Sequence, residues 1–450
     1  MNQSITGNYS LLFICSPSLG ILDTWLPVLS KINELRPDVQ IHCIIPKHRT
    51  VTKIDPDNVL IRLSDDIFDF VICKTEDNKW VKLDNLREAA HLFRAGKMNR
   101  GMKQFLHRLP EGNLNRFTES AVNKLQRFLQ RKRNRNHLFN LQSIQHCTKG
   151  ILYDVYTEKK ESVDEILNYF SGLPKFSMSH GLKVKNINTY QDQNTPLNEN
   201  TIVYIQSENE VGFVRDRFGV PENHQRVVGV PRHEKQWIDT IVEKEKNSGV
   251  ETGDEFIFVI SRPHTTAYHP KSRMKKALQH IRRLAWTDLD KKIVVKLHPK
   301  ERKTGIYEKV FGVENYGSRW VYSNMHPLVL GARCDFAIAF YSGVVVDMIA
   351  MNVPSIELMD LRGLPKFDNE DSLRDSNDEP VFEYRYNDLA LGASDYESLK
   401  KEASKILSER EKVMSLLRKN YNKHYKTKPG VTTQIASEIL SKTSIPSRTE

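Results

Sequence analysis

DFAIAFYSGVVVDMIAMNVPSIE, residues 335–357, is the stretch that decides the fold of this chain. It opens with a mostly apolar run typical of a buried strand, and a small-residue turn follows at 341–343. Residues 344–351 then predict a helix, and residues 355–358 predict a second strand. A strand, a turn, a helix and a second strand form a βαβ unit, which joins two parallel strands of one sheet.

The turn of this unit is a candidate anion site. Backbone N–H groups at the start of a helix, with the helix dipole behind them, attract negative charge. Ser342 adds a hydroxyl and Gly343 permits close approach, so we predict that this turn binds the phosphates of a nucleotide. Glu357 ends the next strand, where its carboxylate can accept hydrogen bonds from ribose hydroxyls. Asp347, one turn into the helix, is interpreted as structural.

The same alternation of apolar runs and helix-like stretches extends over the rest of the chain. Strands are predicted at residues 11–15, 41–45, 59–63, 70–73, 150–153, 176–179, 202–206, 226–228, 256–260, 293–297, 320–322, 335–339 and 355–358. Several of these runs are rich in Ile and Val and nearly continuous, which suits parallel strands covered by helices on both faces. The fold class is therefore α/β, with two doubly wound, Rossmann-like sheets whose strand ends face a cleft.

A polar stretch divides the two sets of strands. Residues 243–255 read EKEKNSGVETGDE, which is typical of a linker. We therefore expect a first domain over residues 1–242, a second over residues 255–395, and C-terminal helices over residues 396–442. Within the last region, residues 396–425 predict one helix with Leu399, Ala403, Ile406 and Leu407 on a common face.

Ligands of open α/β sheets bind at the carboxyl ends of the strands, so candidate catalytic and binding residues are expected in the loops that follow the strands. In the first domain, Ser18 and Gly20 lie in a small-residue turn after the first strand. His180 follows the strand at 176–179, and its ordinary pKa suits it to take a proton from a hydroxyl at neutral pH. Arg232 follows the strand at 226–228, where a guanidinium can bind phosphate or carboxylate.

Three strand-end residues of the second domain complete the candidate site. Arg262 follows the strand at 256–260, while Lys296 and His298 belong to the KLHPK sequence that closes the strand at 293–297. Arg262 and Lys296 are candidate cations for binding the phosphates of a donor. His298 precedes a proline that fixes the local backbone, and its imidazole can donate to a leaving phosphate. The structural alternative for each of these loops is a capped or hydrogen-bonded turn that binds no ligand.

Positive charge is concentrated in one segment. The chain has a formal net charge of +11, and residues 91–137 hold twelve Lys or Arg against two Glu. Part of this segment is amphipathic, which suits an anionic membrane surface, a polyanionic acceptor, or a solvated helix packed on its own domain. No nucleic-acid-binding motif accompanies the charge, so nucleic acid is not expected as a partner.

The remaining features indicate a reduced, cytoplasmic protein. Five scattered cysteines lack CxxC spacing and are expected as free thiols, and the N-terminus MNQSITGNYS lacks the basic start of a secretory signal. No apolar run is long enough to cross a bilayer. The Asp-x-Asp at Asp288 and Asp290 lies in a polar linker, so no metal site is predicted and transfer chemistry would be metal-independent.

The motifs SHG (179–181), GVPR (229–232), KLHPK (296–300) and residues 335–357 occur in an order that resembles the GT-B superfamily of nucleotide-sugar-dependent enzymes. Within it, the chain is similar to enzymes of bacterial surface and capsular polysaccharide synthesis. CDP-glycerol glycerophosphotransferases have Trp-His-Gly, Gly-x-Pro-Arg, an HP pair and Asp-Tyr-Ser-Ser in this order. CMP-sialic-acid and CMP-Kdo capsule transferases share an HP motif and a Ser-rich helix start. The resemblance covers residues 175–360.

The resemblance implies a transferase that moves a sugar or glycerol phosphate from a CMP-, CDP- or UDP-linked donor to a glycan or lipid-linked acceptor. It implies that the first domain binds the acceptor, that His180 is the base, and that His298 and the Ser342–Gly343 turn bind the donor phosphate. Such an enzyme would work in the cytoplasm at the inner face of the membrane. Phe340 and Ser179 depart from the glycerophosphotransferase motifs. Two alternatives stay open: a UDP-N-acetylglucosamine 2-epimerase-like isomerase, and a non-catalytic glycan- or membrane-binding module.

Overall fold

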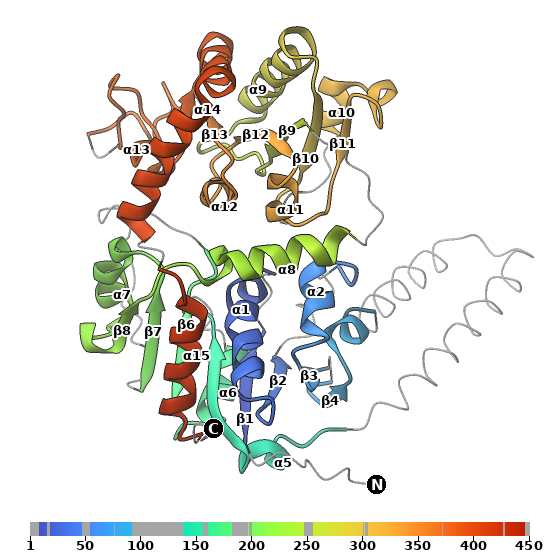
Figure 1. Ribbon diagram of the computed structural model, residues 1–450, viewed down its shortest axis with the longest axis vertical. Helices are drawn as coiled ribbons and strands as arrows, with labels where there is room; N and C mark the ends of the chain where they lie inside the picture. The colour runs from blue at the N-terminus through green and yellow to red at the C-terminus, as the bar shows by residue number, and fades with distance from the viewer. Residues whose placement is uncertain are drawn as a thin grey trace, which may run out of the picture.

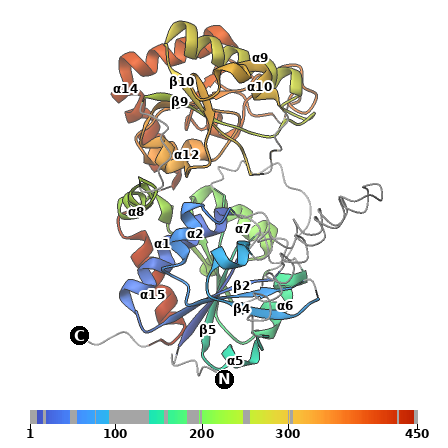
Figure 2. The same cartoon turned by 90° about the vertical axis from the view of Figure 1, so that its right-hand side faces the viewer.

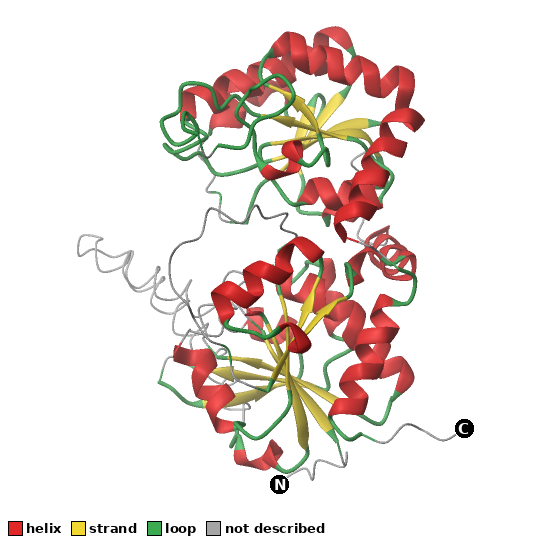
Figure 3. Cartoon of the chain, turned by 90° about the vertical axis from the view of Figure 1, so that its left-hand side faces the viewer, coloured by secondary structure: helices red, strands yellow, loops and turns green. Residues whose placement is uncertain are grey.

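The computed structural model describes residues 9–15, 19–46, 55–75, 77–91, 138–155, 161–181, 197, 200–246, 255–299, 301, 305–370, 372–425 and 428–445. All but the first residue of the basic segment 91–137 lies outside this part of the chain, as does Ser18. The described residues form two sheets with helices on both faces of each (Figure 3). None of the described helices is both long and apolar enough to cross a bilayer.

The first sheet has eight strands in the order β4-β3-β2-β1-β5-β6-β7-β8. All neighbours are parallel except β3 and β4, which are antiparallel. The strands are β1 (Ser10–Ile14), β2 (Gln40–Ile45), β3 (Phe70–Lys74), β4 (Trp80–Leu83), β5 (Thr148–Tyr153), β6 (Lys175–Met178), β7 (Thr201–Ile205) and β8 (Gln225–Val227). The helices are α1 (Leu19–Leu35), α2 (Val59–Ser64), α5 (Gln142–Gln145), α6 (Glu161–Tyr169), α7 (Val211–Phe218) and α8 (Lys235–Lys246), with short 3-10 turns η4 (Glu208–Glu210), η5 (Glu222–His224) and η6 (Pro231–His233).

The second sheet has six parallel strands in the order β11-β10-β9-β12-β13-β14. They are β9 (Phe256–Ile260), β10 (Lys292–Lys296), β11 (Trp320–Tyr322), β12 (Cys334–Ala339), β13 (Ser355–Leu358) and β14 (Leu391–Ala393). The helical elements are α9 (Lys271–Arg283), the π-helical turn η7 (Leu284–Asp288), α10 (Ile306–Phe311), η8 (Val313–Asn315), α11 (Pro327–Gly331), α12 (Val344–Ala350) and α13 (Glu383–Tyr386). Strands β9 and β12 are fully buried along most of their length, which explains their unbroken apolar sequences.

The α/β fold class predicted from the sequence is confirmed, with three local exceptions. Residues 59–63 were expected as a strand but begin helix α2, because the Asn58 side chain accepts a hydrogen bond from the Leu60 N–H (3.0 Å) and caps the helix. The edge strands β4 and β14 were not predicted. They are only four and three residues long, and runs this short give a weak sequence signal.

The long C-terminal helix matches its predicted bounds but is kinked at Glu409, whose φ of −131° and ψ of 35° are not helical, and one side chain departs from the predicted face. Leu399, Ala403 and Ile406 are buried, but Leu407 is 50% exposed. Leu407 follows Ile406 directly, so it is rotated by about 100° around the helix axis and leaves the buried stripe. All five cysteines are buried free thiols, as expected.

The last two helices connect the two sheets. Helix α14 (Tyr396–Tyr425) packs on β13 and β14, and α15 (Val431–Lys442) lies beside α1 of the first sheet (Figures 1 and 2). The end of α14 is bonded to residues that follow β7. Ser207 Oγ donates to the His424 carbonyl (2.7 Å), and Asn209 Nδ2 lies 2.8 Å from His424 Nδ1. We call the first sheet with its helices and α15 the first lobe, and the rest the second lobe.

Gly150 in β5 makes room for the residue after α15. A Cβ atom at Gly150 would lie 2.6 Å from Thr443 Cγ2 and 3.2 Å from Phe176 Cε2. We expect Gly150→Ala to lower the free energy of unfolding by about 1–3 kcal/mol, as overpacking of a core does. Adding Thr443→Ser should recover part of this loss, because it removes the clashing methyl. Urea unfolding measures both, with Gly172→Ala as control since nothing lies within 4 Å there. Equal losses at the two glycines would contradict this account.

Candidate functional site

A histidine and a carboxylate meet at the ends of two adjacent strands of the first sheet. Asp154 directly follows β5 and His180 follows β6, and these strands are parallel neighbours. His180 Nδ1 lies 2.5 Å from Asp154 Oδ2. The Asp154 carboxyl is fully buried, whereas 36% of the His180 side chain is exposed. A buried carboxylate on one ring nitrogen fixes the orientation of the imidazole while its exposed part stays accessible.

His180 was predicted from the sequence, whereas Asp154 was not. The one available signal was an aspartate that closes an apolar strand, in the sequence GILYD of residues 150–154.

The turn around His180 is held by hydrogen bonds. Ser179 Oγ donates to the Gly181 carbonyl (3.2 Å), and Gln206 Nε2 from the end of β7 donates to the Ser179 carbonyl (2.7 Å).

On the second sheet, the predicted phosphate turn is held in an uncommon backbone conformation. Tyr341 has a positive φ of 56°, which is rare for a residue with a Cβ. Its ring stacks on Phe382 at 3.8 Å, and its hydroxyl donates to Glu383 (3.1 Å). Ser342 Oγ accepts a hydrogen bond from the Val344 N–H (3.3 Å) at the start of α12. Packing of Tyr341 therefore fixes the direction in which Ser342 and the following residues face.

Arg262 lies against this turn. Its Nη1 donates to the Tyr341 carbonyl (2.6 Å), and its Nε donates to the Tyr268 hydroxyl (2.8 Å). The guanidinium carbon lies 4.5 Å from the Tyr341 ring centroid and 5.4 Å from that of Tyr268, within cation–π range. The structure thus brings Arg262 and Ser342 together, and it gives Arg262 the additional task of supporting the turn.

His298 lies at the end of β10, and its loop is tied to the end of β9. The His298 carbonyl accepts from the Glu301 N–H (2.8 Å). The Glu301 carboxylate accepts one short hydrogen bond from Ser261 Oγ, and Tyr307 Oη also donates to it (3.3 Å). Because β10, β9 and β12 are neighbours in the sheet, the loops carrying His298, Arg262 and Ser342 occupy three adjacent strand ends.

Lys296 is bonded to the backbone. Its Nζ donates to the carbonyls of Asn324 (3.2 Å) and Met325 (2.6 Å), just before α11. Burial lowers the pKa of Lys296 to about 8, opposed by the nearby carboxylates of Glu245 and Asp23. The predicted role in phosphate binding therefore competes with a role in holding the loop before α11.

Glu357 is buried at the end of β13, with 1% of its surface exposed. Burial raises its pKa to about 8, and Arg385 opposes this shift. Among the described residues, its Oε2 atom has no hydrogen-bond partner. The carboxyl group is enclosed by protein at the position predicted to meet a ribose.

Arg232 differs most from its predicted setting. It is 6% exposed and belongs to a buried set of charges between the lobes, which we call the interlobe network: Asp23, Arg232, His233, His326 and Asp347. Asp347 Oδ1 lies 2.9 Å from Arg232 Nε and 2.7 Å from His233 Nε2. Asp23 lies 3.5 Å from Arg232 and 3.2 Å from His326. The guanidinium is thus engaged by two carboxylates.

Electrostatics favour the charged forms of the carboxylates in this network. Burial alone would raise the pKa of Asp23, but His326 and Arg232 lower it to about 2. The same opposition of burial and Arg232 leaves the pKa of Asp347 below its usual value. Asp347 lies on α12, directly behind the Ser342 turn, so the network joins that turn to the first lobe. Gly20, which was predicted to lie in a turn after the first strand, lies instead in the first turn of helix α1, where its carbonyl accepts a hydrogen bond from Thr24 Oγ1 (2.8 Å).

Comparison with known proteins locates the fold among solved structures. No protein-family model matches this chain, and the search of curated proteins finds no match. A putative UDP-N-acetylglucosamine 2-epimerase from Listeria monocytogenes has a TM-score of 0.55 at 12% identity, covering 98% of both chains. The wall teichoic acid polymerase TagF has a TM-score of 0.55 at 10% identity, covering 97% of this chain and 90% of that one.

A UDP-GlcNAc 2-epimerase from Neisseria meningitidis bound to UDP-GlcNAc is also similar, with a TM-score of 0.50 at 11% identity over 96% of this chain and 99% of that one. At such identities the likeness concerns the fold. The chain therefore has the two-sheet architecture of GT-B-type proteins, as the sequence analysis expected.

Proposed function

We propose that this protein is a transferase that moves a sugar or glycerol phosphate from a CMP-, CDP- or UDP-linked donor to a glycan or lipid-linked acceptor. The observation that carries the proposal is the contact of the exposed His180 with the buried Asp154 at a strand end. A histidine oriented in this way is suited to remove a proton from an acceptor hydroxyl. The GT-B-type fold supports a nucleotide-linked donor on the second lobe.

In the proposed reaction, His180 takes the proton of the acceptor hydroxyl as its oxygen attacks the donor. The attack is on the sugar carbon, or on phosphorus when glycerol phosphate is transferred. The bond from that atom to the nucleotide phosphate oxygen breaks, and the nucleotide leaves with the electron pair. His298, Arg262 and the Ser342 turn would stabilise the negative charge that develops on the phosphate.

Other predicted residues receive more specific roles. Arg232 would act as a positioning residue, because it binds Asp347 on the helix that follows the Ser342 turn. The basic segment 91–137 is proposed, on its charge alone, to contact the acceptor or an anionic membrane surface. Such contact would place the enzyme at the cytoplasmic face of the membrane.

A 2-epimerase-like activity is the second candidate, because epimerases and TagF resemble the chain equally well in structure. An epimerase would convert a nucleotide sugar without any acceptor. Incubation with UDP-N-acetylglucosamine alone, followed by chromatography of the nucleotide sugars, separates the two. A new isomer would favour the epimerase, whereas nucleotide release that depends on an added acceptor would favour the transferase.

A thermal-shift screen with CMP, CDP, UDP and GDP tests donor binding. A nucleotide present at one hundred times its Kd should stabilise the folded protein by about 2.7 kcal/mol, which raises the melting temperature by several degrees. Ser342→Ala should reduce this shift, because it removes a hydroxyl from the phosphate turn. Ser318→Ala, an exposed serine of the same lobe, is the control. Absence of a shift with all four nucleotides would refute the proposal.

A further inference from the structure

The second lobe has a pocket outside the candidate site, which we call the α9 pocket. It is lined by His269, Arg273, Lys276, His280, Asp360 and Ser394, among others. Three of these residues lie on α9, and Asp360 and Ser394 follow β13 and β14. Because the chain moves in opposite directions across the sheet from β9 to β10 and from β12 to β13, right-handed crossovers place α9 and α12 on opposite faces. The pocket is therefore across the sheet from the helix that follows the Ser342 turn.

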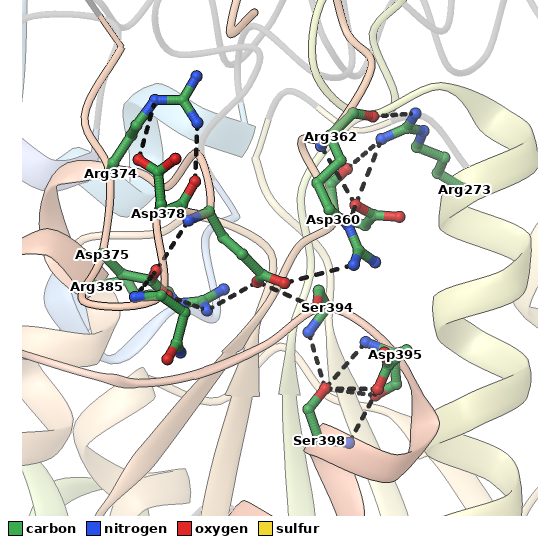
Figure 4. Close-up of polar contacts among 12 residues, drawn as sticks. Arg273, Asp360, Arg362, Arg374, Asp375, Asp378, Arg385, Ser394, Asp395 and Ser398 are labelled. Carbon is green, nitrogen blue, oxygen red and sulfur yellow. Dashed lines mark hydrogen bonds and ion pairs between the residues drawn. The ribbon is translucent and has the colours of Figure 1, made fainter.

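Arg273 is held in this pocket by backbone groups. Its Nη1 donates to the Asp360 carbonyl (2.5 Å) and its Nη2 to the Arg362 carbonyl (2.7 Å), as Figure 4 shows. The closest Asp360 carboxylate oxygen is 3.9 Å away. That carboxylate instead accepts from Arg362 Nε at 2.8 Å. Asp360 is thus paired with Arg362, and Arg273 and Lys276 add two further cations to the lining of the pocket.

Two buried imidazole nitrogens add hydrogen-bonding capacity. His269 is 2% exposed. In the described part of the chain, neither His269 Nε2 nor His280 Nε2 has a hydrogen-bond partner. Burial lowers the pKa of His269 to about 4 and lowers that of His280, so both rings are neutral at pH 7. A neutral imidazole can carry its proton on Nε2 and donate it. A buried polar atom left without a partner is costly, which favours a ligand that accepts hydrogen bonds.

We propose that the α9 pocket binds a small oxyanion of the phosphate class, either free phosphate or the phosphate group of a small metabolite. Arg273 and Lys276 supply positive charge from one side. The Nε2 atoms of His269 and His280 supply neutral donors. Charge-assisted hydrogen bonds of this kind are stronger than neutral ones. The site stands apart from the donor-binding role proposed for the Ser342 turn.

The test is the affinity for inorganic phosphate, measured by calorimetry at constant ionic strength with chloride as the replaced anion. Lys276→Gln should weaken binding about tenfold, the loss expected for one charge-assisted hydrogen bond. Lys275→Gln is the matched control, because Lys275 is the exposed neighbour on the same helix and does not line the pocket. Its affinity should stay within about twofold of the unmodified protein.

Two further arms identify the source of the phosphate and the place where it binds. Titration with glycerol 3-phosphate tests a metabolite phosphate against the free anion; tighter binding of either probe names the source. Titration of phosphate in the presence of a saturating nucleotide from the thermal-shift screen should give an unchanged affinity. No phosphate binding, equal weakening by the two lysine variants, or competition with the nucleotide would each overturn the proposal. Unaltered nucleotide binding by Lys276→Gln keeps this test separate from that of the proposed function.

Discussion

Asp154→Asn should lower the turnover of nucleotide release by about 10²–10⁴-fold, close to the loss expected from His180→Ala. The reason is geometric. The buried carboxylate at 2.5 Å from His180 Nδ1 sets the orientation of the ring and stabilises the imidazolium that forms on proton transfer. Because the two residues act as a unit, the double variant should be no slower than His180→Ala alone. The measurement is the steady-state release of nucleotide from a donor that carries the nucleotide identified in the thermal-shift screen.

This expectation distinguishes a catalytic pair from a structural one. The thermal shift caused by the nucleotide should be unchanged in both variants, since neither residue lies on the second lobe. His146→Ala, an exposed histidine of the first lobe, should retain full turnover. Independent losses that add up in the double variant, or full activity of Asp154→Asn, would contradict the role assigned to Asp154.

Arg232→Met should destabilise the protein by about 3–5 kcal/mol, because it takes from Asp23 and Asp347 the guanidinium that they share in a buried environment. Asp347→Leu should cost a similar amount, since it leaves Arg232 and His233 without their shared carboxylate. Urea unfolding measures both changes. The double variant, which removes both partners of the ion pair, should be less destabilised than the sum of the two single variants.

Arg215→Ala is the matched control for the ion pair. Arg215 pairs with Asp216 and Glu222, but its side chain is 52% exposed, so its loss should lower the free energy of unfolding far less than Arg232→Met does. If Arg232→Met behaved like Arg215→Ala, the interlobe network would contribute little to stability.

Sequence patterns were informative wherever one local property decided the structure. The apolar run and small-residue turn at 335–343 identified β12 and the turn before α12, because a buried parallel strand leaves few polar positions. The helix at 396–425 was equally clear from its periodic apolar face. The strand predicted at residues 59–63 was wrong because short apolar runs fit strands and helices alike. The side chain of Asn58 caps this segment, which favours the helix.

Contacts between distant residues account for what the sequence did not reveal. The role assigned to Asp154 depends on its contact with His180, which follows the neighbouring strand. The two residues are 26 positions apart, and no sequence pattern links them. Arg232 was predicted to meet a ligand because it follows a strand. The structure pairs it with Asp347, 115 residues away on another lobe. The position of a residue at the end of a strand predicts where its backbone lies. The partner that its side chain contacts depends on how the two lobes pack together.

The position of α15 bears on the order in which the chain acquires its structure during synthesis. The residues of the first sheet end at Val227, yet the helix that covers α1 is made only after the whole second lobe, at Val431–Lys442. After the strands of the first lobe have been synthesised, some 200 further residues must therefore be translated before the face of α1 that α15 covers is buried. During that interval the nascent protein would expose a hydrophobic face to chaperones. A fragment ending near residue 242 would carry the same defect permanently, which makes the two lobes interdependent products of one uninterrupted polypeptide.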